Sequence, residues 1–209
     1  MKYNLPKPYI SYSQLDLWRK NKDQYRERYY FEDGVPFENT ETIFGKKIAK
    51  MLEDGVSDPV LDRIPKYKFS EYRIQIKVGG VPFLGVMDSF SKHFKRILEF
   101  KTGKQEWDDV RVRKHDQLVV YSMLTKLKFG KVDPTVRLVW METRYKKTVD
   151  TIGSMTCEAE SSELELTGKI KIFKRKIYEW ERKNMVKLIQ KTAQEISDDY
   201  TNFLKTKNE

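Results

Sequence analysis

The chain of 209 residues has a single cysteine, Cys157, and only two histidines. One cysteine excludes an internal disulfide and any zinc or iron–sulfur site that needs several cysteines. No uninterrupted apolar run approaches the ~18 residues that suggest a membrane span. The first ten residues, MKYNLPKPYI, also lack the apolar segment of a signal peptide. We therefore expect a soluble, cytoplasmic protein that does not contact a membrane.

Basic residues are in excess, with 41 Lys and Arg against 31 Asp and Glu, a formal net charge of +10. This excess favours a polyanionic partner, although a lysine-rich solubilising surface is the plainer interpretation. The length fits one domain, and the 39% hydrophobic content is enough for a packed core. We therefore expect one domain spanning 1–209.

The region 13–54 is predicted to be helical. Ser13 with Asp16 resembles a capping box at the start of the first helix. Its large apolar residues recur at helical spacing and form a stripe: Leu15, Trp18, Tyr25 and Tyr29. Such a stripe is typical of a core-facing helix, but aromatics among basic residues also suit stacking on single-stranded nucleic acid. A second helix is predicted at Glu41–Asp54, with Gly55 as its C-cap.

Alternating apolar and polar residues then predict an antiparallel meander. Its strands are expected at Glu71–Val78, Val81–Asp88 and Arg96–Lys101. Gly79-Gly80 is typical of a two-residue hairpin turn between the first two strands. These strands begin a predicted catalytic core at 70–145.

A helix at Val110–Lys128 is expected to cross over to Thr135–Thr143, an apolar strand of the kind buried on both faces. A strand reached by such a crossover lies parallel to a strand of the meander. The acidic segment Gly153–Glu163 is interpreted as a surface loop. The C-terminal region 165–205 follows, with a strand at Glu165–Phe173 and a long helix from Arg175 to Leu204. The predicted fold is α/β, with a central mixed sheet flanked by helices.

Three polar side chains stand at the ends of two of these strands. Glu99 and Lys101 are two apart on one strand and share a face, whereas Phe100 points into the core. Asp88 ends the preceding strand and can reach the same place. Two carboxylates and the Phe100 backbone carbonyl form an all-oxygen set suited to Mg²⁺ or Mn²⁺. The Glu-x-Lys spacing alone is weak, because an exposed pair of this kind is usually a solvated ion pair.

Five motifs in order make the interpretation more specific. The chain resembles a PD-(D/E)XK nuclease of the RecB-like exonuclease branch, which implies a restriction-endonuclease-like fold. The matching segments are Ser11-Tyr12-Ser13 with Leu15 and Trp18, Gly45 with Glu53, Gly85-Val86-Met87-Asp88, Glu99-Phe100-Lys101-Thr102-Gly103, and Gln117 with Tyr121. The later part of the chain resembles stand-alone exonucleases of bacteriophages.

The resemblance assigns roles to individual residues. It implies that Asp88 and Glu99 hold Mg²⁺ beside the Phe100 carbonyl, with Mn²⁺ able to substitute, and that Lys101 is the catalytic lysine. Gln117 and Tyr121 would flank the active site on a helix, although ordinary helix packing also explains this pair. Glu53 would be an outer or second-metal ligand.

Two departures from the branch stand out. Many members carry a histidine four residues before the helical acid, where this chain has Ala49, and neither His93 nor His115 aligns with that position. Members with an iron–sulfur cluster need four cysteines, the first of which would fall near Asn21. This chain therefore has no iron–sulfur cluster, and the number of metal ions stays open.

The expected partner is DNA, single-stranded or with free ends. Its predicted contacts are Ser11, Ser13, Thr102, Lys104, Arg113 and Lys114. The leading hypothesis is a DNA exonuclease of phage replication, recombination or DNA degradation, acting with a phage partner in the host cytoplasm. A structure-dependent endonuclease or nickase is the first alternative. A catalytically silent DNA-binding recruitment module is the second.

Overall fold

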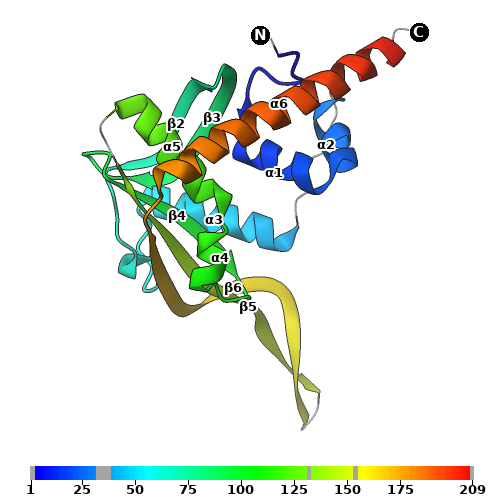
Figure 1. Cartoon of the computed structure of the whole chain (residues 1–209). Helices are drawn as coiled ribbons and strands as arrows, with labels where there is room; N and C mark the ends of the chain where they lie inside the picture. The colour runs from blue at the N-terminus through cyan, green and yellow to red at the C-terminus, as the bar shows by residue number, and fades with distance from the viewer. Residues whose placement is uncertain (1–2, 32–38, 131–132, 153–154, 208–209) are drawn as a thin grey trace.

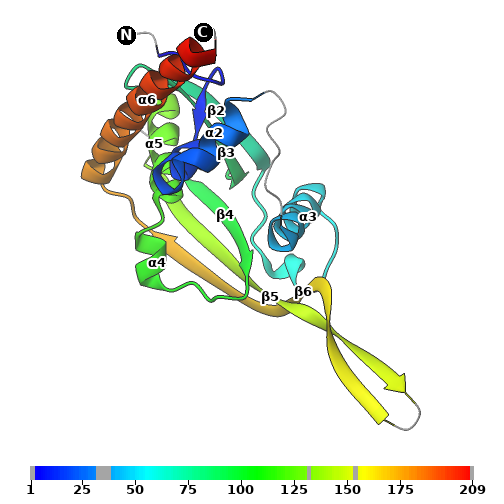
Figure 2. The same ribbon diagram turned by 90° about the vertical axis from the view of Figure 1, so that its right-hand side faces the viewer.

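Six strands form one mixed β-sheet through the middle of the molecule, and helices cover both of its faces (Figures 1 and 2). The computed structural model describes residues 3–31, 39–130, 133–152 and 155–207, with side-chain surroundings for these residues outside 148–160. The strand order is β1-β3-β4-β5-β6, and β2 pairs with the other edge of β3. The predicted α/β fold with a mixed sheet is confirmed.

The strands are β1 (Ile10–Ser11), β2 (Phe69–Val78), β3 (Val81–Phe90), β4 (Arg96–Gly103), β5 (Thr135–Ile152) and β6 (Met155–Arg175). The helices are α1 (Tyr12–Lys20), α2 (Lys22–Tyr29), α3 (Thr40–Asp54), α4 (Asp109–Arg113), α5 (Asp116–Phe129) and α6 (Glu179–Lys207), with a 3₁₀ turn at Leu61–Arg63. Among the described residues, no helix combines the length and apolar character needed to cross a bilayer.

The meander and its parallel neighbour follow the sequence pattern. Gly79 and Gly80 turn the β2–β3 hairpin with φ of 55° and 88°, left-handed values that glycine adopts without strain. Strand β5 lies parallel to β4, with Glu99 beside Leu138, because the α4–α5 crossover returns the chain to the same end of the sheet. The predicted hairpin turn and parallel strand are confirmed.

Two apolar clusters lie on opposite faces of the sheet. The larger packs α1, α2, α5 and α6 against the sheet around residues such as Leu15, Phe83 and Leu118. The smaller packs α3 against the other face around Ile48, Leu98 and Val139. Successive strand residues alternate between these clusters, so Glu99 and Lys101 face α5 while Phe100 faces α3.

The first predicted helix is broken in two, and its cap was misplaced. Ser11, not Ser13, is the N-cap of α1, and it accepts a hydrogen bond from the Gln14 backbone N–H at 3.4 Å. Asn21 adopts an extended backbone (φ −155°) that ends α1, and its side chain accepts from Gln24 N–H at 3.0 Å to start α2. The aromatic residues keep helical spacing on both sides of Asn21, so the spacing alone does not reveal the break between α1 and α2.

The aromatic stripe of these helices is part of the core. Trp18 and Tyr25 are buried in the larger cluster. The indole of Trp18 donates to Glu195 of α6 at 2.9 Å, and Arg26 pairs with Asp199 of α6 at 2.6 Å. The core-facing interpretation of this stripe is the one that the structure supports.

The predicted Val110–Lys128 helix is also two helices, with a break at Lys114 and His115. At this break the buried Arg175 guanidinium donates to two backbone carbonyls, one in α4 and one at the N-cap of α5. Its bonds to the carbonyls of Val112 and His115 measure 3.1 and 2.9 Å. A long-range side chain therefore completes the C-terminus of α4.

The segment Gly153–Glu163 was predicted as a loop, but from Met155 onward it is strand β6. Strands β5 and β6 form a long antiparallel hairpin that projects from the body (Figure 2). Acidic residues of β6 pair with basic residues of β5, including Arg144 with Glu165 at 2.7 Å and Lys146 with Glu163 at 2.6 Å. The backbone ladder with β5 makes a strand of this acidic, weakly patterned segment, and these cross-strand pairs add to it. Strand β6 continues to Arg175, so α6 begins at Glu179 instead of Arg175.

Candidate functional site

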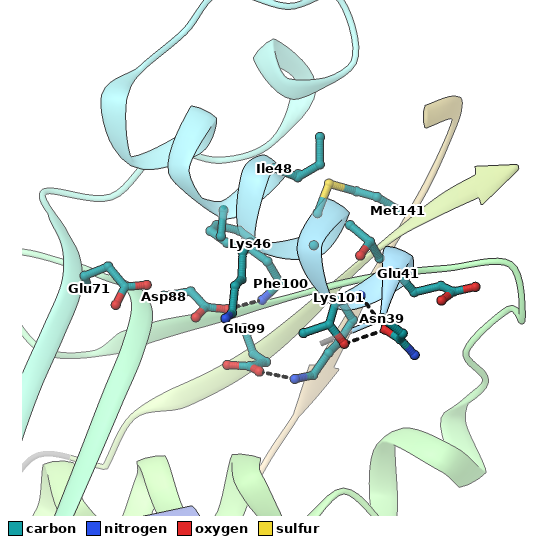
Figure 3. Close-up of a pocket in the computed structure, with 14 residues that line it drawn as sticks. Asn39, Glu41, Lys46, Ile48, Glu71, Asp88, Glu99, Phe100, Lys101 and Met141 are labelled. Carbon is teal, nitrogen blue, oxygen red and sulfur yellow. Dashed lines mark hydrogen bonds and ion pairs between the residues drawn. The ribbon is translucent and has the colours of Figure 1, made fainter. Parts of the chain in front are cut away.

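The candidate site lies where β3 and β4 separate. These two strands pair only at Ser89 with Leu98 and at Phe90 with Ile97. One residue further along, Asp88 stands opposite Glu99 where no pairing remains. The carboxylate of Asp88 instead accepts a hydrogen bond from the Phe100 backbone N–H at 2.6 Å. The two predicted metal ligands therefore face each other across a local opening in the sheet (Figure 3).

A polar chain links the opening to α5. Lys101 forms an ion pair with Glu99 at 2.5 Å and donates to the Gln117 side-chain carbonyl at 3.0 Å. The Gln117 amide donates in turn to the Tyr121 hydroxyl at 2.6 Å. The structure thus brings together Glu99, Lys101, Gln117 and Tyr121, as the sequence predicted. One turn of helix separates Gln117 from Tyr121, which places both side chains on the face toward Lys101.

Glu99 has an unsatisfied atom. Its side chain is only 2% exposed, and while Oε1 binds Lys101, Oε2 is buried with no hydrogen-bond partner among the described residues. A buried carboxylate oxygen without a donor is strongly disfavoured unless a ligand or cation completes its surroundings. A cation, or a hydrogen-bond donor of a bound molecule, would satisfy this oxygen.

The protonation equilibria of the site reflect burial and crowded negative charge. Burial, followed by repulsion from Glu99, raises the pKa of Asp88 well above its usual range. Burial lowers the pKa of Lys101, but attraction to Glu99 and Asp88 outweighs it and the pKa is raised overall, so Lys101 stays an ammonium. Burial and Glu99 also raise the pKa of Tyr121 well above its usual range, so its hydroxyl stays neutral. A single lysine does not balance the carboxylates.

Glu71 is a carboxylate at the site that sequence reasoning missed. It stands opposite Asp88 in the register of β2 and β3, and no backbone pairing joins them there. Its φ of 47° is in the left-handed region, which is strained for a residue with a side chain. Figure 3 shows its carboxylate turned toward Asp88. Burial, followed by repulsion from Glu53, raises the pKa of Glu71. Its strand pattern suggested only an exposed position.

Asp88, Glu99 and Lys101 line a cavity of about 510 Å³, and helix α3 forms another of its walls. The helix contributes Gly45, Lys46 and Ala49 to the lining. A Cβ on Gly45 would lie 3.1 Å from the Thr102 hydroxyl oxygen, so this glycine lets the helix approach β4 closely. Ala49, where many members of the branch carry histidine, does face the cavity.

Glu53 lies one turn beyond Ala49 and does not line that cavity. It lines a neighbouring hollow that also reaches Asp88 and Phe100. Its carboxylate pairs with Lys50 at 3.1 Å. The predicted outer-ligand role of Glu53 stays a prediction.

The predicted DNA contacts are spread over several places. Thr102 lines the cavity, and the Lys104 ammonium lies over the Tyr145 ring at 3.6 Å. Ser11 caps α1 and shares a hydrogen bond of 2.9 Å with Ser13. Arg113 and Lys114 lie at the end of α4, where Arg113 lines a separate hollow. The structure therefore does not gather these six residues into one surface.

A metal ion would have few ready ligands. Within the described ranges, no three His, Cys, Asp or Glu side chains are grouped closely enough to hold one. The site offers the acidic side chains of Asp88, Glu99 and Glu71, and the backbone of Phe100. Magnesium accepts such a partial set, because it keeps several waters and takes oxygen ligands from the substrate. The orphaned oxygen of Glu99 and the uncompensated charge fit a cation.

Comparisons with known proteins give only distant similarities. No family model and no curated protein matches the chain. The solved structure of SSO0001 is similar at 14% identity over 89% of this chain and 75% of that chain, with a TM-score of 0.47. A protein of Eubacterium rectale provisionally named an exonuclease is similar at 13% identity over 88% of this chain and 66% of that chain, with a TM-score of 0.41. Similarities this weak carry no argument about activity.

Proposed function

We propose that this protein is a metal-dependent deoxyribonuclease that hydrolyses phosphodiester bonds of linear or single-stranded DNA, with exonuclease action as the main mode. One observation carries the proposal. The opening between β3 and β4 holds Asp88 and Glu99 face to face, with a buried Glu99 oxygen that has no partner among the described residues. The Lys101–Gln117–Tyr121 chain borders the same opening.

The chain's own residues divide the work. Asp88, Glu99 and the Phe100 carbonyl are the groups that would hold Mg²⁺ or Mn²⁺. When bound, the ion supplies a polarised phosphoryl oxygen and a water of lowered pKa. Lys101 carries a positive charge in a largely buried position, where it stabilises negative charge that develops on the phosphate.

Gln117 and Tyr121 position Lys101. The Gln117 carbonyl accepts from the Lys101 ammonium at 3.0 Å, and the Tyr121 hydroxyl accepts from the Gln117 amide at 2.6 Å. The ammonium can only donate, so the Gln117 carbonyl faces Lys101, and the Tyr121 hydroxyl satisfies the other end of the amide. This arrangement holds the ammonium before the substrate binds, which is the preorganisation that electrostatic catalysis requires.

The proposal is tested with end-labelled single-stranded, linear duplex and closed circular DNA, each with Mg²⁺, Mn²⁺ or EDTA. The parent should degrade linear and single-stranded DNA only with metal. Asp88→Ala should abolish cleavage, and Lys101→Ala should slow it by about 10²–10³-fold. Lys126→Ala is the matched control, because Lys126 pairs with Glu179 on the surface, outside the site. If Asp88→Ala and Lys101→Ala both cut as fast as the parent, the site is misassigned.

The substrates also separate the competing hypotheses. Resistance of closed circular DNA supports an exonuclease, whereas its cleavage supports the endonuclease or nickase. DNA binding without any metal-dependent product supports the silent recruitment module. We further propose a role in phage DNA replication, recombination or degradation, which phage-encoded partners would support.

A further inference from the structure

A second surface lies apart from the carboxylate site, between α4 and the start of α6. A hollow there, of about 640 Å³, is lined by residues that include Arg113, Lys174, Tyr178 and Trp180. Trp180 also borders an adjoining hollow on α6 with Lys183 and Lys187. We call the surface formed by Arg113, Lys174, Lys176, Tyr178, Trp180, Lys183 and Lys187 the Trp180 surface.

The aromatic rings of this surface are unusually exposed. Trp180 is 63% exposed and Tyr178 is 53% exposed. The other three tryptophans, Trp18, Trp107 and Trp140, are at most 8% exposed. A large aromatic ring left in water marks a place where another molecule packs.

The charge of the surface selects an anion. Within the described part of the chain, none of its five basic residues forms an ion pair: Arg113, Lys174, Lys176, Lys183 and Lys187. The Lys176 ammonium lies over the Tyr178 ring, 5.6 Å from its centre. The nearby Glu181 carboxylate is neutralised by Arg175 at 2.5 Å. Asp109 is the remaining acid in the lining of the hollow. The surface therefore has a local positive excess beside its aromatic rings.

The two rings stand on a fixed support. Glu181 accepts from the Tyr178 backbone N–H at 2.8 Å while it holds Arg175. Arg175 donates to the carbonyl of Val112 in α4 and to that of His115, the N-cap of α5. Two residues past His115, Gln117 binds the Lys101 ammonium. Through these bonds the Trp180 surface has a fixed place relative to the carboxylate site, and Figure 2 shows α4 beside the end of β6 and the start of α6.

We propose that the Trp180 surface is a binding site for a single-stranded nucleic acid segment, whose bases stack on Trp180 and Tyr178 while its phosphates contact the basic residues. Unpaired bases offer the ring faces that stacking needs, whereas a duplex hides them. The proposal rests on the proposed nuclease function, because the Trp180 surface would bind the substrate strand at a distance from the carboxylate site. Its test does not depend on cleavage.

The test measures binding of a fluorescein-labelled oligothymidylate of about 15 nucleotides by anisotropy, with the full chain in EDTA. Trp180→Ala should weaken binding at least about 5-fold, whereas Trp180→Phe keeps a stacking ring and should bind close to the parent. Lys174→Ala should reduce the slope of log affinity against log salt by about 0.7, the share of one phosphate contact on a single strand. Leu127→Ala is the matched control, because Leu127 is 54% exposed on α5.

Acrylamide quenching gives a second readout. Trp180 is the one strongly exposed tryptophan among the four. Bound oligonucleotide should therefore reduce the quenching of tryptophan fluorescence by acrylamide in the parent but not in Trp180→Phe. Unchanged binding by Trp180→Ala overturns the proposal, even where the parent cleaves DNA. An effect of Trp180→Ala on sedimentation without an effect on binding also overturns it, in favour of a contact between copies of the chain. If the parent binds the oligonucleotide through Trp180 but cleaves DNA with neither Mg²⁺ nor Mn²⁺, the result supports this surface and refutes the proposed nuclease.

Discussion

Replacing Asp88 with asparagine should make the metal-free protein more stable and remove its response to metal. The asparagine side chain has nearly the same shape, and its carbonyl can still accept from the Phe100 N–H that Asp88 binds at 2.6 Å. What the change removes is a charge held between Glu71 and Glu99. Clustered buried carboxylates destabilise a fold until protons or a cation neutralise them.

The size of the effect follows from the burial of the site. Burial and Glu99 raise the pKa of Asp88 well above its usual range, and each pKa unit corresponds to 1.36 kcal/mol of preference for the uncharged form. We expect Asp88→Asn to stabilise the metal-free fold by about 1–3 kcal/mol. In a chain of this length, each kcal/mol moves the unfolding temperature by about 2–4 °C.

Thermal unfolding with and without metal measures both the stability gained in the metal-free variant and its lost response to metal. Mg²⁺ or Mn²⁺ at about one hundred times its dissociation constant should stabilise the parent by about 2.7 kcal/mol and Asp88→Asn much less. Asp62→Asn is the control, since Asp62 pairs with Lys66 at 3.1 Å and its removal should not stabilise the fold. The reasoning is refuted if Asp88→Asn unfolds below the parent in EDTA, or if metal stabilises both proteins equally.

Three other outcomes are expected. Glu71→Gln should raise the metal concentration needed for half-maximal cleavage more than Glu53→Ala does, because Glu71 lines the cavity whereas Glu53 pairs with Lys50. If neither variant changes the metal titration, neither residue belongs to the site. Burial, followed by repulsion from Lys101, lowers the pKa of His115 to about 4, so its neutral form stabilises the fold above pH 6.5. This stabilisation, at most about 3 kcal/mol, should be lost as the pH falls from 6.5 to 4, and His115→Phe should flatten that part of the urea-measured stability profile. Gly85→Ala should destabilise the fold by about 1–3 kcal/mol, because its Cβ would lie 2.3 Å from Leu124 Cδ1, and Leu124→Ala in the same chain should recover part of that loss in a double-mutant cycle.

The sequence by itself predicted most of the elements and the centre of the site. Alternation fixed the faces of β2, β3 and β4, and the two glycines at 79–80 fixed the turn between the first two strands. The i, i+4 spacing of Gln117 and Tyr121 placed both on one helix face, and the structure brings that face to Lys101. These features are local, so short-range patterns in the chain contain them.

The elements that were missed depend on distant partners. The break between α4 and α5 is completed by Arg175, 60 residues beyond His115. The acidic segment from Met155 onward is a strand because its backbone pairs with β5 along its length. No local pattern contains information on which side chain will supply a cap or which strand will be adjacent.

The sequence determined that Glu99 and Lys101 share one face of their strand, because side-chain alternation is a property of the strand itself. The strands run past their predicted ends at Asp88 and Lys101, to Phe90 and Gly103. Only the tertiary structure decided that β3 and β4 separate beside Asp88 and that Glu71 stands on the other side of Asp88. Both features depend on which residues of β3 pair with β2 and which pair with β4. That pairing is set by the packing of the whole sheet and is absent from any short stretch of the chain.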